Sequence, residues 1–172
     1  MAVPPPTSRL RFRELGSGDL PALAAILQDP VAMVAYEGPF SDAEVGDWLD
    51  HQRERYARDG HGLWAVLLRG SGEFVGQCGL TWQDVDGERV LEVGYHLLRA
   101  QWHHGYASEA ARACCDHAFT VLGAPVVHAI VRDTNLASMN VAIRCGMTAR
   151  RSFVKHYRGI DMAHIDFAVR RT

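Results

Sequence analysis

Trp102-His103-His104-Gly105-Tyr106-Ala107 joins a predicted strand to a predicted helix. Apolar and β-branched residues at 90–99 predict the strand, and small apolar residues at helical spacing predict a helix over 105–122. The first turn of a helix carries free backbone N–H groups at the positive end of the helix dipole, and both features favour anions. This stretch therefore predicts a binding site for a phosphorylated ligand.

The residues around this junction predict one βαβ unit. A strand follows at 126–132, and it is apolar on both faces as expected of a central strand. A crossover of this kind is right-handed and leaves its two strands parallel. Further strands are predicted at 10–15, 63–69, 73–82, 149–155 and 160–169, and helices at 20–27, 42–58 and 135–145. The hairpins among them make the sheet mixed.

Length and composition favour one globular domain. The chain has 172 residues and a net charge of −2, which argues against nucleic acid held by bulk charge. Pro4, Pro5 and Pro6 predict a short flexible leader over 1–8, followed by a single domain over 9–172. No apolar run reaches the ~18 residues of a membrane span, and no signal peptide is recognisable. We expect a cytoplasmic protein that binds no membrane and keeps its four cysteines reduced. A homodimer is compatible with this composition.

Several other ligand motifs are excluded. The chain has no G-x-x-x-x-G-K-[ST] loop, and the loose G-x-G-x-x-A at 60–65 precedes a strand and opens no helix. Asp84-Val85-Asp86-Gly87 is too short for a calcium loop and is typical of a turn. His103 and His104 have no acidic or thiol partner nearby in the sequence, so we expect no metal site.

Three motifs in order resemble the GNAT N-acetyltransferase superfamily. The stretch from Trp102 to Ala107 resembles its acetyl-CoA loop, Q/R-x-x-G-x-G/A, with Trp102, Gly105 and Ala107 at the three fixed positions. Asn135-x-x-Ser138 and Gly146-Met147 are similar to its second signature, and 91–97 resembles its fourth strand. Trp in the first position resembles the RimJ/RimL-like branch, which acetylates protein N-termini. The resemblance implies an α/β fold: a mixed, mostly antiparallel sheet of six to seven strands with a central parallel βαβ unit and about four helices.

The resemblance also implies acetyl-CoA as cosubstrate, without a metal. Backbone N–H groups from His103 to Ser108 are suited to the phosphates, and the end of the 90–99 strand is suited to the pantetheine arm. Asn135 is equally a good helix N-cap, and both roles are compatible. Arg99, Arg112 and Arg144 are candidate partners for outer phosphates. The implied acetyl-CoA residues are Tyr95, Leu97, Leu98, Arg99, His103, His104, Gly105, Tyr106, Ala107, Ser108, Asn135 and Ser138.

Catalysis requires a neutral amine and a proton for the leaving thiolate. Neutralising an α-amine of pKa ~8 at pH 7 costs about 1.4 kcal/mol, whereas a lysine of pKa ~10.4 costs about 4.6 kcal/mol. Glu92 is the candidate base, acting directly or through a water, with His96 as an alternative acid or base. Many family members carry a tyrosine acid seven residues after the motif asparagine, but this position is Ala142 here, so Ser138, water or solvent must serve. Direct attack is favoured over an acetylated Cys145.

The acceptor pocket is expected between the irregular segment 33–40, the 90s strand and the turn at 156–161. Its candidate residues are Tyr36, Glu37, Phe40, Trp82 and His96. The acceptor is a primary amine, either a peptide N-terminus or a small molecule such as an aminoglycoside, a polyamine or an amino acid. A non-catalytic acyl-CoA-binding module is the alternative of another class.

Overall fold

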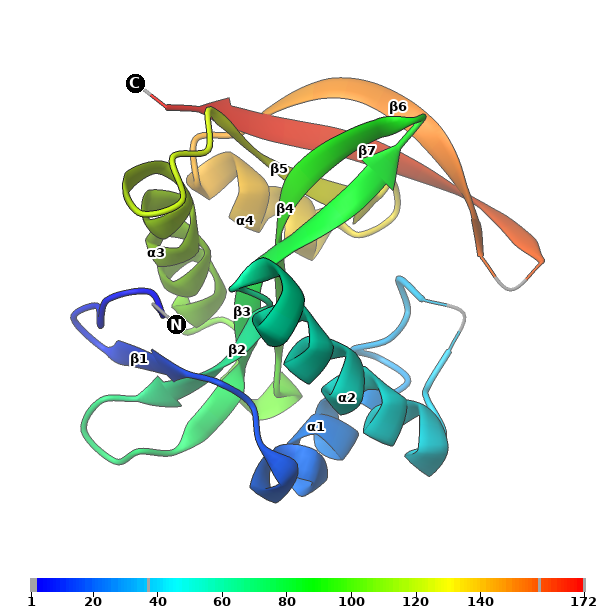
Figure 1. Ribbon diagram of the computed structural model, residues 1–172. Coiled ribbons are helices and arrows are strands. Elements are labelled where there is room, and N and C mark those ends of the chain that lie inside the picture. Colours follow the sequence, from blue (N-terminus) through cyan, green and yellow to red (C-terminus); the bar gives the residue numbers. More distant parts are fainter. Residues whose placement is uncertain (1–2, 37, 158, 172) are drawn as a thin grey trace.

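A seven-stranded mixed sheet forms the centre of the molecule (Figure 1). The computed structural model describes residues 3–36, 38–157 and 159–171. The strand order is β1-β2-β3-β4-β5-β7-β6, and every neighbouring pair is antiparallel except β4 and β5. The strands are β1 (Leu10–Arg13), β2 (Leu63–Leu68), β3 (Phe74–Val85), β4 (Glu88–Leu97), β5 (Val126–Arg132), β6 (Thr148–Tyr157) and β7 (Ile160–Arg170). The predicted fold class is confirmed.

Four α-helices in the described residues cover the two faces of this sheet. Alternation along β2 shows the division: Ala65 and Leu67 pack with α1 and α2, whereas Trp64 and Val66 pack with α3 and α4. Figure 1 shows the blue and teal α1 and α2 together, and α3 and α4 together at a separate part of the sheet. The helices are α1 (Leu20–Leu27), α2 (Asp42–Asp59), α3 (Tyr106–Thr120) and α4 (Leu136–Arg144), with short 3-10 turns at Ser17–Asp19 and Arg99–Gln101.

Helix α2 begins and ends where its sequence predicts. Ser41 and Glu44 form a capping box, with the Glu44 N–H donating to Ser41 Oγ at 3.3 Å and the Ser41 N–H donating to Glu44 Oε2 at 2.7 Å. Gly60 ends the helix in the left-handed conformation, with φ of 75°.

The β3–β4 hairpin is longer than the sequence predicts. Strand β3 continues to Val85 and β4 begins at Glu88, so the turn comprises only Asp86 and Gly87. Both residues have positive φ, 52° and 80°, which is the geometry that lets a two-residue turn follow the strand twist. The prediction that the first of these strands ends at 82 is therefore wrong.

Strands β4 and β5 separate almost as soon as they pair. Their parallel register contains one pair, Glu92 with His128. Beyond it, β5 pairs with β7 on its other side, and the C-terminal half of β4 pairs only with β3. This separation leaves a gap between the C-terminal half of β4 and β5.

The described part of the leader lies against α3. Pro4 is buried, Thr7 Oγ1 donates to Glu109 Oε1 at 2.5 Å, and Ser8 Oγ donates to the same oxygen at 3.2 Å. Elsewhere, no helix within the described ranges is long and apolar enough to cross a membrane. The cysteines at 78, 114, 115 and 145 are all free thiols.

Candidate functional site

A cavity of about 880 Å³ opens where β4 and β5 separate. Three groups of elements line it. The loop after β4 and the start of α3 contribute Trp102, His103, Gly105, Tyr106, Ala107 and Ser108, and the start of α4 contributes Asn135 and Ser138. Most of the remaining wall comes from α2, β3, β4, β5, β6, β7 and the segment before α2, and includes Tyr36, Trp48, Arg55, Glu92, His96, Lys155, Met162 and His164.

The loop between β4 and α3 has the backbone form of an anion site. His103 and Gly105 both have positive φ, 64° and 80°, and Gly105 is the N-cap of α3. Because Gly105 has no side chain, no cap bond covers the first turn of α3, and the N–H groups of that turn have no partner within the helix. Tyr106, Ala107 and Ser108 of that turn line the cavity. The donor set fits a pyrophosphate such as that of coenzyme A.

Side chains outside the motif hold this loop in place. Trp102 Nε1 donates to the carbonyl oxygen of Leu97 at 3.0 Å, which ties the loop to the end of β4. Arg9 Nη1 donates to the carbonyl oxygen of His104 at 2.9 Å, and its guanidinium lies over the Tyr106 ring at 4.7 Å. Arg9 had no recognisable sequence signal, because it lies some hundred residues away and reaches the loop only through the fold.

The start of α4 carries the predicted asparagine cap. Asn135 Oδ1 accepts from the Ser138 N–H at 3.1 Å, which confirms the N-cap interpretation. Ser138 Oγ donates to the hydroxyl oxygen of Tyr95 at 3.0 Å, and Tyr95 donates to the Ser138 carbonyl oxygen at 2.8 Å. Burial raises the pKa of Tyr95, so its hydroxyl stays protonated at neutral pH. Ala142, one turn further along α4, is buried and does not line the cavity.

Glu92 lies at the point where the two parallel strands part. Its Oε1 accepts from the Ile130 N–H at 3.3 Å, so a side chain of β4 rather than its backbone binds β5 here. Thr81 Oγ1 is 3.5 Å from Glu92 Oε2. Burial raises the pKa of Glu92 above its ordinary value of 4.5, although the charges of Lys155 and Arg55 oppose the shift.

Aromatic rings surround His96 on the acceptor side of the cavity. The hydroxyl of Tyr36 and Nε2 of His96 are 2.8 Å apart, and the Trp48 and His96 rings meet edge to face at 5.6 Å. Trp48 Nε1 donates to Gln77 Oε1 at 3.0 Å, which fixes the indole. Burial lowers the pKa of His96 to about 4, which favours the neutral imidazole at pH 7.

Some predicted cofactor residues lie outside the cavity wall. The Leu98 N–H donates to the carbonyl oxygen of Val75, and the Arg99 side chain is paired with Asp29 at 3.3 Å. The ring of His104 stacks on Tyr106 with centroids 5.5 Å apart. Arg112 donates through Nε and Nη2 to the Arg144 carbonyl oxygen at 3.0 and 2.6 Å. Leu98, Arg99, His104 and Arg112 do not line the cavity, whereas Leu97 and Arg144 do.

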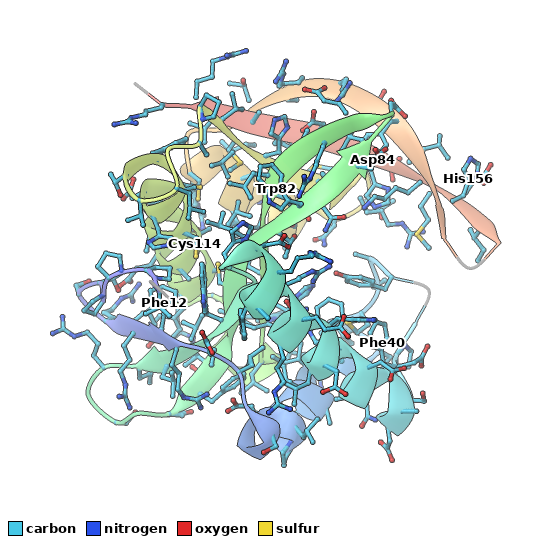
Figure 2. All side chains as sticks on the ribbon, in the orientation of Figure 1. Phe12, Phe40, Trp82, Asp84, Cys114 and His156 are labelled. Atoms are coloured by element: carbon cyan, nitrogen blue, oxygen red, sulfur yellow. The ribbon has the colours of Figure 1, made fainter. Side chains whose placement is uncertain are left out.

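Two predicted acceptor residues also lie outside the wall. Trp82 stacks with Arg89 at 4.5 Å, and Phe40 packs edge to face on Tyr36 and Trp48, behind the residues that face the cavity. Figure 2 shows Trp82 on the β3–β4 hairpin, well apart from Phe40 beside α2. The predicted turn at 156–161 is likewise displaced, since His156 is exposed at the end of the hairpin. Glu37 lies outside the described residues.

Sequence reasoning missed the basic side chains on the acceptor side. Arg55 and Lys155 both line the cavity, from α2 and β6. A signal existed for Arg55, because Trp48, Gln52 and Arg55 follow helical spacing and therefore share a face of α2. No such signal existed for Lys155, whose position depends on how β6 crosses the cavity.

The comparisons with known proteins agree with this geometry. The acetyltransferase (GNAT) domain model matches residues 9–148. The chain belongs to the GNAT acetyltransferase family. Proteins of this family use acetyl-CoA, and this GNAT domain is accordingly an N-acetyltransferase.

Relatives of this GNAT domain extend over most of its length. Protein YkkB of Bacillus subtilis is 34% identical over 142 residues, which cover 82% of this chain and 83% of YkkB. The crystal structure of an acetyltransferase from Agrobacterium tumefaciens is 27% identical, with a TM-score of 0.82 over 99% of this chain and 96% of that one. The ribosomal L7/L12 alpha-N-protein acetyltransferase RimL, in complex with coenzyme A, is 18% identical and shares the fold, with a TM-score of 0.79 over 98% of each chain.

Proposed function

We propose that this GNAT domain acetylates the α-amine at the N-terminus of a protein or peptide by direct attack on the thioester of acetyl-CoA. The observation that carries the proposal is one continuous cavity that is lined by the anion-binding turn of α3, the Glu92 carboxylate and the Ser138 hydroxyl. RimL, which has the same fold, is an alpha-N-protein acetyltransferase. An α-amine also needs far less help to lose its proton at neutral pH than a lysine side chain does.

The turn of α3 would hold the pyrophosphate of acetyl-CoA. Its N–H groups and the helix dipole supply positive charge, and Gly105 leaves the backbone open to approach. Asn135 and Ser138 at the start of α4, together with Tyr95 and Leu97 of β4, border the space between the separated strands where the pantetheine arm would run. When bound, acetyl-CoA supplies an activated acetyl group and a thiolate leaving group.

Glu92 would take the proton from the acceptor amine. Glu92 lines the cavity, and its raised pKa makes it a stronger base than an exposed glutamate. A water between Glu92 and the amine would carry the proton if the amine does not reach the carboxylate. His96 would serve as a neutral wall residue, because its pKa is lowered to about 4.

Ser138 would relay a proton to the leaving thiolate and take a replacement from water, so that its hydroxyl is restored in the same step. Its hydroxyl lies at the start of α4. The position that carries a tyrosine in many family members is Ala142 here, one turn further along the same helix. When Ser138 turns its hydrogen toward sulfur, the Tyr95 hydroxyl is placed to donate to Ser138 Oγ in return, because the two oxygens are 3.0 Å apart. Tyr95 is thus a positioning residue, and it is held neutral by its raised pKa.

Acetylation of a cysteine is not needed for this reaction. Cys145 does not line the cavity, and burial raises the pKa of its thiol to about 11. A thiol with so high a pKa is scarcely ionised at pH 7 and is a poor nucleophile. Direct attack by the amine is therefore the simpler route.

A panel of acceptors tests the proposal. Purified protein with acetyl-CoA should release free thiol in the presence of short peptides with free N-termini, and mass spectrometry should locate the acetyl group on the α-amine. The same peptides with blocked N-termini and an internal lysine should react at least tenfold more slowly. Preferential acetylation of a polyamine or an aminoglycoside would instead identify a small-molecule enzyme. Tight coenzyme A binding without turnover on any amine would identify a binding module.

A further inference from the structure

The wall of the cavity is unevenly charged. Four basic side chains contribute to its wall, namely Arg55, Arg132, Arg144 and Lys155. Among the residues that the structure describes, Glu92 is the single carboxylate in that wall. A cavity built for a polycation would have the opposite composition, since like charges repel in a partly enclosed space.

Two of these four cations are set apart from Glu92: one is hydrogen-bonded to the backbone of another segment, and the other lies near the loop before α3. Arg132 Nη1 donates to the carbonyl oxygen of Val34 at 2.8 Å, so this guanidinium fastens the segment before α2 to β5. Arg144 lies in the last turn of α4, next to the loop that would bind phosphates, and its carbonyl oxygen is held by Arg112. Arg55 and Lys155 remain as the cations beside the catalytic carboxylate.

Arg55 and Lys155 approach Glu92 from different elements. Arg55 comes from α2 and Lys155 from β6, and both charges are close enough to oppose the rise in the pKa of Glu92. Within the described ranges, no ion pair joins Arg55 or Lys155 to a carboxylate. Arg55 instead donates from Nη1 to Gln52 Oε1, a neutral oxygen, at 3.3 Å.

Arg55 is also partly desolvated. Its side chain is partly buried at the cavity wall, and burial lowers the pKa of its guanidinium. A cation that has lost part of its water shell is stabilised by an anion that can accept two parallel hydrogen bonds, as a carboxylate does. The guanidinium fork makes arginine well suited to this geometry.

We propose that the acceptor of this enzyme carries a carboxylate close to the amine that is acetylated, and that Arg55 and Lys155 bind it. For a peptide acceptor this means an aspartate or glutamate within the first few residues. Glu92 would then receive the amine while the two cations fix the acidic group on either side, which orients the amine toward the thioester. This inference rests on the proposed acetyl transfer to a peptide amine and adds the class of peptide.

Matched peptides test the inference in the wild-type enzyme. Peptides that begin Ser-Asp or Ser-Glu are compared with Ser-Asn, Ser-Gln and Ser-Lys peptides that are otherwise identical. We expect kcat/KM to be at least tenfold higher for the acidic peptides, because one charge-assisted hydrogen bond contributes enough binding free energy for a factor of about ten. The preference should shrink in high salt. A phosphoserine peptide distinguishes carboxylate from phosphate recognition: a kcat/KM for the phosphoserine peptide equal to or above that for the Ser-Asp peptide would overturn the assignment of a carboxylate.

Variants connect the preference to the two cations. Arg55→Gln and Lys155→Met should each raise KM for the acidic peptide about tenfold more than KM for the Ser-Asn peptide, so that the acidic preference of the same variant is lost, and should leave the coenzyme A affinity intact. Arg55→Lys should recover part of the loss. Arg53→Gln is the matched control, because Arg53 lies on the same helix with 58% of its side chain exposed and pairs with Asp50.

The outcomes separate the two proposals. Acetylation of neutral, basic and acidic peptides at equal efficiency would overturn the acidic-acceptor inference and leave acetyl transfer to peptides standing. An unchanged acidic preference in both variants would overturn the assignment to Arg55 and Lys155. No acetylation of any peptide would overturn the proposed function itself.

Discussion

The Tyr95 hydroxyl and the first turn of α4 are joined by two hydrogen bonds across the gap between β4 and the elements that follow β5. Tyr95 donates to the Ser138 carbonyl oxygen at 2.8 Å and accepts from Ser138 Oγ at 3.0 Å. The two strands themselves pair at one position only, Glu92 with His128. Side chains therefore connect β4 to α4 near the place where backbone pairing of β4 with β5 stops, and the space they border is the candidate active site.

The Ser138–Tyr95 pair predicts a graded loss of turnover. Ser138→Ala should lower kcat about 100-fold, as loss of a general acid does, while leaving KM for acetyl-CoA within a factor of a few. Tyr95→Phe keeps the ring and removes the hydroxyl, so we expect a smaller loss of about tenfold. Steady-state kinetics with a thiol assay measures both. Ser152→Ala is the control, because Ser152 is exposed on β6 away from the cavity. A wild-type rate in Ser138→Ala would eliminate Ser138 as the acid.

The pKa of Glu92 predicts the acidic limb of the pH profile. Because burial raises this pKa above 4.5, kcat/KM should rise with pH through a midpoint above the ordinary glutamate range. Glu92→Gln should lower kcat most on the plateau above that midpoint and remove the limb. Glu54→Gln, on the exposed side of α2, should change neither. A Glu92→Gln enzyme with the wild-type profile would exclude Glu92 as the base.

Glu92→Gln should affect stability in the opposite direction from activity. A raised carboxyl pKa means that the folded state binds the proton more tightly than the unfolded state does. Stability from this group is therefore fully present below the unfolded pKa and is lost as pH rises through the folded pKa. At neutral pH the amide removes the cost of a buried charge, so thermal unfolding of the variant should occur at a higher temperature than in wild type.

His96 predicts a loss of stability in acid. Burial lowers its pKa from 6.5 to about 4, so the folded state resists protonation. The stability that this group contributes is present above pH 6.5 and is lost as pH falls toward 4, by up to about 3 kcal/mol. His96→Gln should flatten the dependence of unfolding free energy on pH in this window, measured by denaturant titration. An equally steep dependence in the variant would show that other groups cause the acid sensitivity.

Gly105 predicts a specific loss of coenzyme A binding. Gly105→Glu places a side chain and a negative charge at the N-cap of α3, so calorimetry should show a Kd for coenzyme A at least tenfold higher. Gly123→Glu is the matched control. Its φ of 67° is close to the 80° of Gly105, so both variants carry a similar strain of about 1–2 kcal/mol. Equal coenzyme A affinities in the two variants would contradict the phosphate site at α3.

Direct attack predicts that Cys145 is dispensable. Burial raises the pKa of its thiol to about 11, and its Sγ lies 3.8 Å from the carbonyl oxygen of Ser108 behind the cavity wall. Cys145→Ala should keep kcat within about twofold of wild type, and rapid quenching followed by mass spectrometry should find no acetylated enzyme. An acetyl group on Cys145 in the quenched wild-type enzyme would replace direct attack with a two-step route.

Local sequence rules located most elements correctly. The capping box at Ser41 and Glu44 predicted the start of α2, and Asn135 predicted the start of α4, because caps act within one helical turn. The error at the β3–β4 hairpin had a local cause as well, since Asp86 and Gly87 alone are enough for a turn. The predicted acceptor residue Trp82 had no such local basis, and its ring faces Arg89 instead of the cavity.

The sequence by itself determined the strand, turn and helix around Trp102 to Ala107 and hence an anion site, because these features depend on neighbouring residues and on backbone geometry. It also determined that Ala142 cannot be an acid. Only the tertiary structure decided what shares the cavity with that site. Three interactions show this: Arg9 donates to the loop before α3, Ser138 donates to Tyr95, and the charges of Arg55 and Lys155 act on Glu92. Each joins elements that are far apart in the chain. Such contacts depend on how strands separate and helices pack, and no local pattern contains that information.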